Sequence, residues 1–117
     1  MTAPAPAGTP WPGSPVTENA TVELSELRGA YRRLLISAPE TCRRSRAGQF
    51  VAIATGDELV HPLRRFFTLV DVEPASGRVE LLIAATSPAT AWIGQRRPGD
   101  VLDVFGPLGR PFPRPPA

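Results

Sequence analysis

The chain has 117 residues and a formal net charge of +2, with 13 basic residues, all arginine, among 11 acidic ones. Since these arginines are interspersed with acids along the sequence, no basic stripe predicts nucleic-acid binding. The single cysteine excludes an internal disulfide and a four-cysteine cluster, and without a signal-peptide pattern or a membrane-length apolar run we expect a cytoplasmic protein with no membrane contact.

The prolines divide the chain into a central folded segment and two tails. Five of the 15 prolines lie within residues 4–15 and five within residues 107–116. Pro-rich stretches without hydrophobic periodicity are typical of extended or disordered segments. We therefore expect a disordered Pro/Ala-rich lead-in over residues 1–19, one domain over residues 20–109 and a Pro-rich tail over residues 110–117.

The first half of the folded segment predicts three strands. Residues 20–27 alternate polar and apolar side chains, which is the pattern of a half-buried strand. A turn at residues 28–29 leads to a second predicted strand over residues 31–38. Residues 39–46 are predicted to form a loop or a short helical turn, and residues 47–54 a glycine turn followed by the third strand.

The second half predicts three further strands. Residues 65–73 and 78–85 form the fourth and fifth strands, joined by the Pro, Ser and Gly of a turn over residues 74–77. Another Pro-Gly turn at residues 97–100 leads to a sixth strand over residues 101–105.

One short helix is expected between the fifth and sixth strands. Ser87 is a good N-cap residue, and Pro88 is well tolerated at the first helical position. The helix should cover residues 89–95, with Trp92 and Ile93 packing inward. Together the elements predict an all-β fold, a six-stranded antiparallel barrel of Greek-key type with one short helix after the fifth strand.

Residues 62–72 carry the most informative motif of the chain. At the start of the fourth strand, Arg65, Phe66, Phe67 and Thr68 place a guanidinium, aromatic rings and a hydroxyl close together. The guanidinium can fork onto phosphate oxygens, a ring can stack on a planar ligand, and the hydroxyl can reach a polar edge. The same residues also suit a solvated strand end with an aromatic side chain in the core, so both interpretations stay open.

Four segments in this order resemble the flavin-binding domain of ferredoxin–NADP reductase-type proteins. They are residues 47–51, 63–68, 90–92 and 97–109. Within that family the sequence is most similar to the electron-transfer subunit of dihydroorotate dehydrogenase, and the likeness covers about residues 19–113.

The resemblance implies a six-stranded barrel that holds FAD. By this likeness Arg65 faces the FAD pyrophosphate, Phe67 lies near the ring system, and Thr68 hydrogen-bonds the cofactor, with Phe66 inside the same motif. Further cofactor contacts are implied at the strand-five segment of Leu82, Ile83 and Ala84, and at Ala89 and Thr90 of the phosphate loop.

The sequence departs from the family pattern in three respects. The phosphate loop, commonly Gly-x-Gly-Thr, covers residues 87–90 here and contains Pro88, which has no N–H to donate. Ile83 and Ala84 stand where an aromatic and a basic residue are common. The chain also lacks the nicotinamide-binding and cysteine-rich segments with which family members continue, so we expect a flavoprotein or reductase partner to supply the NAD and iron–sulfur functions.

Two functions remain open at this point. One is the FAD module of an oxidoreductase electron-transfer subunit, which the resemblance links to pyrimidine biosynthesis. The alternative is a non-catalytic truncated barrel that binds flavin weakly or not at all and acts as an interaction module. No nucleophile–base pair or metal constellation is found, and His61 stands without Cys, His or carboxylate neighbours, so neither a catalytic residue nor a metal site is predicted.

Overall fold

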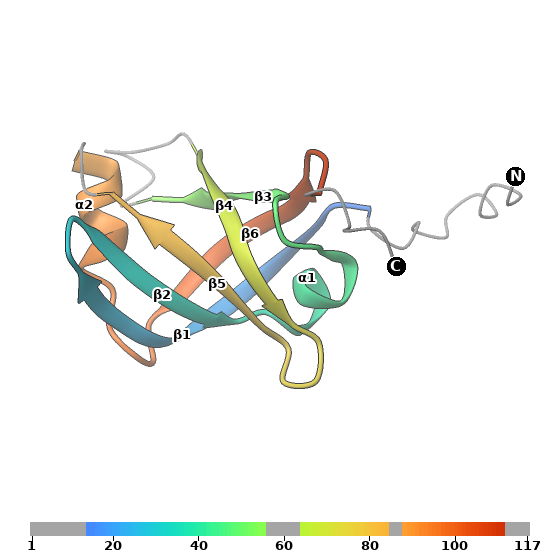
Figure 1. Ribbon diagram of the computed structural model, residues 1–117, viewed down its shortest axis with the longest axis horizontal. Coiled ribbons are helices and arrows are strands. Elements are labelled where there is room, and N and C mark those ends of the chain that lie inside the picture. The colour runs from blue at the N-terminus through green and yellow to red at the C-terminus, as the bar shows by residue number, and fades with distance from the viewer. Residues whose placement is uncertain (1–13, 56–63, 85–87, 112–117) are drawn as a thin grey trace, which may run out of the picture.

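The computed structural model describes residues 14–55, 64–84 and 88–111, so the predictions for His61 and Ser87 lie outside the described residues. The described residues form six strands and two short helices, shown in Figure 1. In chain order these are β1 (Val16–Arg28), β2 (Tyr31–Ser37), α1 (Pro39–Arg44), β3 (Phe50–Ala54), β4 (Arg64–Glu73), β5 (Arg78–Ile83), α2 (Pro88–Gly94) and β6 (Val101–Leu108).

The strands close into a barrel in the order β1-β2-β5-β4-β3-β6, and each neighbouring pair is antiparallel. Three consecutive strands, β3, β4 and β5, lie side by side, and β5 also pairs with β2, which precedes all three in the chain. This strand order is a Greek-key arrangement. The predicted six-stranded antiparallel barrel is therefore confirmed. Closure pairs every strand on both sides, so the sheet has no free edge.

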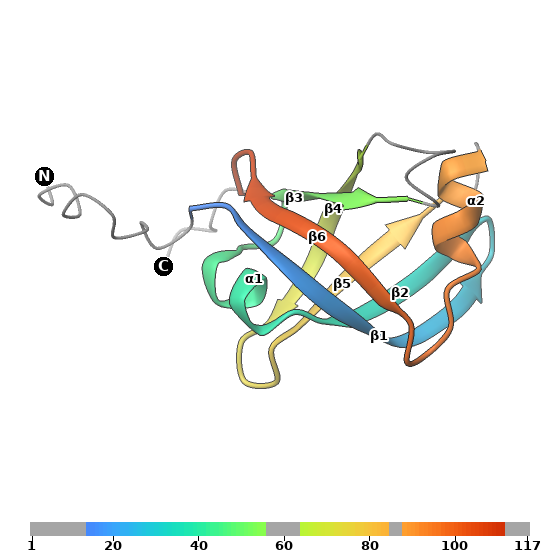
Figure 2. The ribbon, with the colours of Figure 1, turned by 180° about the vertical axis from the view of Figure 1, so that it is seen from behind.

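The core fills the barrel with alternating side chains from every strand, as the period of two requires. The two helices add one side chain each, Cys42 from α1 and Ile93 from α2. Figure 2 shows α2 at one end of the barrel and α1 toward the other. Of the described helices, neither is long and apolar enough to cross a membrane. The largest fully buried side chains on the strands are Val22, Leu34, Ile36, Val51, Ile53, Leu69, Val79, Leu81, Ile83, Leu102 and Val104.

The first and last strands are longer than predicted. β1 begins at Val16, within the predicted lead-in, because Val16 to Asn19 pair with Gly106 to Asp103 of β6. β6 accordingly continues to Leu108 and not only to Phe105. This pairing joins the two ends of the folded segment, so local sequence pattern carried no signal for it.

Residues 39–44 form the helix α1, so of the two alternatives predicted for residues 39–46 the helical turn is the correct one. The barrel therefore has a second short helix besides the one predicted after the fifth strand. Ala38, at the N-cap, provides no side-chain hydrogen bond. Glu18 of β1 replaces it: its carboxylate accepts hydrogen bonds from the backbone N–H groups of Glu40, at 3.0 Å, and Thr41, at 2.8 Å, and from the Thr41 hydroxyl, at 2.9 Å. A strand residue therefore satisfies the first amides of α1, which otherwise lack acceptors.

Cys42 should react very slowly with thiol reagents in the native protein. Its side chain is buried, its Sγ lies 3.4 Å from the carbonyl oxygen of Arg78, and burial raises the pKa of the thiol. Since the thiolate is the nucleophile, both effects oppose alkylation. We expect labelling by iodoacetamide at neutral pH to be about a hundredfold slower or more in buffer than in guanidinium chloride. Similar rates in the two solvents would contradict the buried position of Cys42.

Candidate functional site

The two adjacent phenylalanines of β4 lie on opposite sides of the barrel wall. Phe67 is 7% exposed and belongs to the core cluster, whereas Phe66 is 66% exposed and Thr68 is also exposed. Successive side chains on a strand point to opposite faces, so only one of the two rings can face outward. The ring of Phe67 therefore lies in the core and the ring on the surface is that of Phe66, while the contact of Phe67 with a cofactor ring stays a prediction.

The two arginines at the start of β4 have different surroundings. Arg64 donates to the carbonyl oxygens of Ala52 and Asp103, both at 3.1 Å, and forms an ion pair of 2.9 Å with the Asp103 carboxylate. Arg64 therefore connects β4 both to its neighbour β3 and to β6, the strand beyond it. Arg65 is exposed, and among the described residues no hydrogen bond or ion pair holds its guanidinium. Arg65 is thus the arginine of this pair that is available to an anionic ligand.

The exposed ring of Phe66 is supported by a second aromatic residue. Phe50 of β3 meets Phe66 edge to face, with ring centroids 5.5 Å apart and an angle of 86° between the planes. Such pairs are favourable beyond the area they bury. Gly109 makes room for this arrangement, since a Cβ there would overlap the ring of Phe50 and its φ of +77° favours glycine. Phe50 was not among the predicted site residues, although it lies within one of the segments that carried the resemblance.

The end of β5 lies next to the start of β4. The antiparallel pairing of Leu69 with Leu81 brings the next residues, Thr68 and Leu82, to neighbouring positions on the two strands. Leu82 is 42% exposed, whereas Ile83 points into the core. We call the exposed residues Phe66, Thr68 and Leu82 the outer strip.

On its other side the outer strip borders an ion-pair network. Arg33 of β2 is paired in register with Leu82, and its guanidinium bonds the carboxylates of Glu26, at 3.2 Å, and Glu80, at 3.1 Å. Hydrogen bonds from Arg28 and then Arg33 lower the pKa of Glu26, so this carboxylate remains charged at neutral pH. Arg33 is therefore neutralised within the protein, unlike Arg65.

The remaining predicted contacts lie around α2. Ala84 is half-buried just past the end of β5, Ala89 is in the first turn of α2, and Thr90 follows it, half-buried. Figure 1 shows the end of β5 beside α2. The structure thus brings Phe66, Thr68 and Leu82 together on the outer face of β4 and β5, and Ala84 follows the end of β5, while the side chains of Phe67 and Ile83 lie in the interior. Arg65 is exposed at the start of β4, and by the same alternation it belongs to the face of β4 that carries Phe67.

The chemistry of these residues suits a planar ligand with an anionic group. The unpaired guanidinium of Arg65 can bind phosphate, the Phe66 ring and Leu82 offer apolar contact to a ring system, and the Thr68 hydroxyl can donate or accept. In the part of the chain that the structure describes, no group of three or more His, Cys, Asp or Glu could hold a metal ion. The residues present therefore fit a flavin nucleotide.

Comparisons by sequence confirm the expected resemblance. The chain is 32% identical over 80 residues to the electron transfer subunit of dihydroorotate dehydrogenase B (NAD(+)) from Geobacillus thermodenitrificans, a match covering 68% of this chain and 31% of the relative. The corresponding subunit from Desulforamulus reducens is 35% identical over 78 residues, covering 67% and 30%. The chain spans about a third of the length of these curated relatives. No protein-family model matches it.

Solved structures share the fold. An NADH-dependent reduced ferredoxin-NADP oxidoreductase, described for flavin-based electron bifurcation, superposes with a TM-score of 0.69 at 24% identity, over 79% of this chain and 33% of that one. A ferredoxin reductase of carbazole 1,9a-dioxygenase, in an FAD apo form, gives 0.64 at 20% identity, over 82% and 31%. A siderophore utilization protein from T. fusca gives 0.67 at 16% identity, over 91% and 49%. At these identities the likeness establishes the barrel architecture.

Proposed function

We propose that this chain is the FAD-binding module of an oxidoreductase electron-transfer subunit of the dihydroorotate dehydrogenase type. The observation that carries the proposal is the exposed guanidinium of Arg65 at the start of β4, which has no ion pair or hydrogen bond among the described residues and directly precedes Phe66 in the chain. The sequence likeness to electron-transfer subunits supports this assignment, because its aligned region covers two thirds of the chain.

Each residue of the site has a distinct task in this proposal. Arg65 binds phosphate oxygens of the cofactor, Thr68 hydrogen-bonds a polar edge of the ring system, and Phe66 and Leu82 cover its apolar surface. Arg64 holds the start of β4 in place through its contacts with Asp103. When bound, the flavin supplies the oxidation and reduction chemistry, while the protein binds it, orients it and excludes water.

The nicotinamide and iron–sulfur functions are proposed to come from outside the residues of this sequence. The chain spans about a third of the length of its curated relatives, and Cys42 is its only cysteine. Cys42 is buried in the core, so it is not placed to act as a ligand. We therefore propose that electrons pass between the flavin and groups that lie outside the residues of this sequence.

The visible absorption spectrum during titration with FAD tests the proposal. We expect a bound-flavin spectrum with wild-type protein, and FAD affinity about ten- to a hundredfold weaker in Arg65→Ala, since hydrogen bonds to charged groups contribute about 1.5–3 kcal/mol. Arg46→Ala is the matched control: it removes the same charge from another exposed arginine with no ion pair among the described residues. Equal loss of affinity in both variants would show a general charge effect and contradict the assigned role of Arg65.

One observation favours the alternative of a barrel with weak or absent flavin binding. Pro88 begins α2, and proline has no N–H to offer an anion. If the missing N–H at Pro88 prevents the binding of the cofactor phosphates, the wild-type protein will give no bound-flavin spectrum even at high FAD concentration. That result would remove the electron-transfer proposal and leave a role in binding a protein partner.

A further inference from the structure

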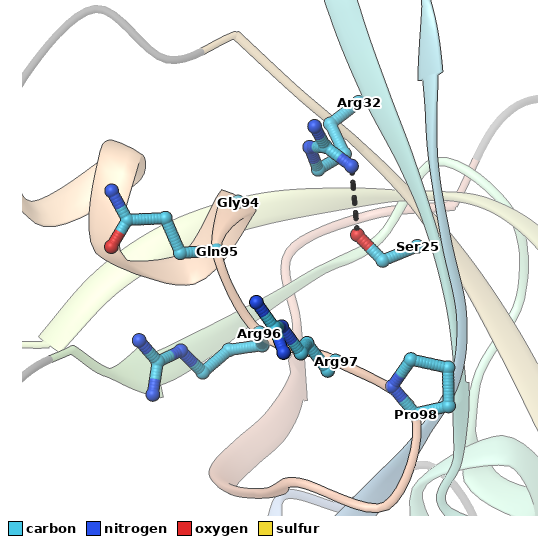
Figure 3. Close-up of a pocket in the computed structure, with 7 residues that line it drawn as sticks. All are labelled: Ser25, Arg32, Gly94, Gln95, Arg96, Arg97 and Pro98. Carbon is cyan, nitrogen blue, oxygen red and sulfur yellow. Dashed lines mark hydrogen bonds between the residues drawn. The ribbon is translucent and has the colours of Figure 1, made fainter.

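We propose that a pocket between α2 and the β1–β2 hairpin binds a phosphate-class oxyanion, separately from the flavin site. The pocket has a volume of about 300 Å³ and is lined by Ser25, Arg32, Arg96 and Arg97 together with Gly94, Gln95 and Pro98. Figure 3 shows Arg32 and Ser25 coming from the hairpin and Arg96 and Arg97 from the chain that follows α2. Neither Arg65 nor any residue of the outer strip lines this pocket.

The charges of the pocket are unbalanced. Three guanidiniums line it, and no carboxylate is among the lining residues. In the described ranges none of these three arginines forms an ion pair. By contrast, ion pairs neutralise most other described arginines, namely Arg28, Arg33, Arg43, Arg44, Arg64 and Arg78. Three like charges among the residues that line one cavity create a positive potential that attracts anions.

Neutral groups hold two of the arginines in place. Arg32 donates to the Ser25 hydroxyl at 3.3 Å, and its stem packs beside Gly94, where a Cβ would lie 3.6 Å from the Arg32 Cδ. Arg96 donates from Nε to the carbonyl oxygen of Trp92 at 3.0 Å, and its guanidinium lies 4.0 Å from the centre of the Trp92 ring. These contacts orient the guanidiniums without cancelling their charge, so an anion would find donors that are already ordered.

The third arginine lies on a stabilised turn. The backbone N–H of Arg97 donates to the carboxylate of Asp100 at 2.7 Å, and the N–H of Asp100 donates to the carbonyl oxygen of Arg97 at 2.9 Å. Asp100 is thereby bound to the backbone of the turn and does not line the pocket. The Arg97 side chain is exposed, so it can close over a ligand from the solvent side.

Phosphate is the anion that best fits these donors. Its oxygens accept the paired N–H groups of guanidinium in a planar fork, and the Ser25 hydroxyl offers a further donor. A cavity of about 300 Å³ also leaves space for a small organic group attached to the phosphate. The ligand is therefore either free phosphate or a small phosphate ester.

NMR titration of backbone amides in the absence of FAD tests the proposal, with inorganic phosphate and glycerol 2-phosphate as probes at constant ionic strength. We expect saturable shifts over residues 94–99, with a Kd of about 1 mM or tighter. Tighter binding of the ester would assign the site to phosphate esters, and equal or weaker binding would assign it to free phosphate.

Variants separate this pocket from the flavin site. Arg97→Gln and Arg32→Gln should each weaken phosphate binding about fivefold or more, because each removes a charge-assisted donor. Arg46→Gln removes the same charge elsewhere and should leave the affinity unchanged, as should Arg65→Ala. Arg97 is exposed, so its variant should fold even if Arg32→Gln does not.

Two results would overturn the proposal. One is the absence of saturable shifts at residues 94–99 up to about 10 mM phosphate. The other is a loss of phosphate binding in Arg65→Ala but not in Arg97→Gln, which would place the phosphate at the flavin site. The first result would leave the flavin proposal untouched, because that site uses Arg65 and the outer strip.

Discussion

Replacing Leu81 by alanine should lower the free energy of unfolding by about 2–5 kcal/mol. Leu81 is fully buried, and it pairs with Leu34 of β2 on one side and Leu69 of β4 on the other, both of which are also fully buried. Truncation removes apolar contact and leaves a cavity that rigid barrel walls cannot close. In a domain of this size the loss is comparable to a large part of the total stability.

The neighbouring residue provides a matched control for this experiment. Leu82→Ala makes the same chemical change one position along the same strand, but its side chain is 42% exposed and faces outward. We expect a loss of about 0.5 kcal/mol in urea denaturation, typical of a surface substitution, together with weaker FAD binding. Equal destabilisation by the two substitutions would mean that the inward and outward faces of β5 have been assigned wrongly.

Glu18→Ala should lower the free energy of unfolding by about 2–4 kcal/mol, which is a large loss for the change of a charged residue. Its carboxylate accepts three hydrogen bonds from the start of α1, including one from the hydroxyl of Thr41, which is fully buried. Without Glu18, the Thr41 hydroxyl and N–H lose their acceptor away from water. Because Cys42 follows Thr41 in the helix and is part of the core, its alkylation rate should rise as α1 loosens.

Two variants control for this effect. Glu18→Gln retains one acceptor oxygen, so its stability in urea denaturation should lie between those of the wild type and Glu18→Ala. Glu23→Ala removes a carboxylate from the same strand, where it makes only a 3.9 Å ion pair with Arg78, and should cost about 0.5 kcal/mol or less. A similar loss for Glu23→Ala and Glu18→Ala would refute the capping role.

The two proposed anion sites use four of the arginines that have no acidic partner among the described residues: Arg65 in one, and Arg32, Arg96 and Arg97 in the other. Arg65 is exposed at the start of the strand that carries Phe66 and Thr68, and we propose that it binds the phosphate groups of a ligand with a large planar part. Arg32, Arg96 and Arg97 line one cavity whose lining residues include no carboxylate, which suits a compact anion. FAD titration of Arg65→Ala and phosphate titration of Arg97→Gln therefore report on separate properties of the protein.

The strands, the turns and the helix after the fifth strand could be predicted from the amino-acid sequence, apart from the start of β1 and the end of β6. These features depend on neighbouring residues: alternation of side chains marks the strands, and Pro-Gly turns end them. Trp92 and Ile93 were likewise expected to pack inward, and Ile93 is fully buried while Trp92 packs against the core. The order of four short segments was also sufficient to indicate the flavoprotein resemblance.

The face of the barrel on which each side chain of β4 lies depends on how the strands close into the barrel. Alternation alone did not state whether Phe66 or Phe67 lies outside, because that depends on the face each strand presents after closure. Nor could it separate Arg64 from Arg65, since Arg64 is held by Asp103, which lies far along the chain on β6. The Glu18 cap of α1 and the arginine pocket also consist of residues that are far apart in the sequence. Barrel closure brings distant residues together, and their contacts leave no periodic pattern in the sequence.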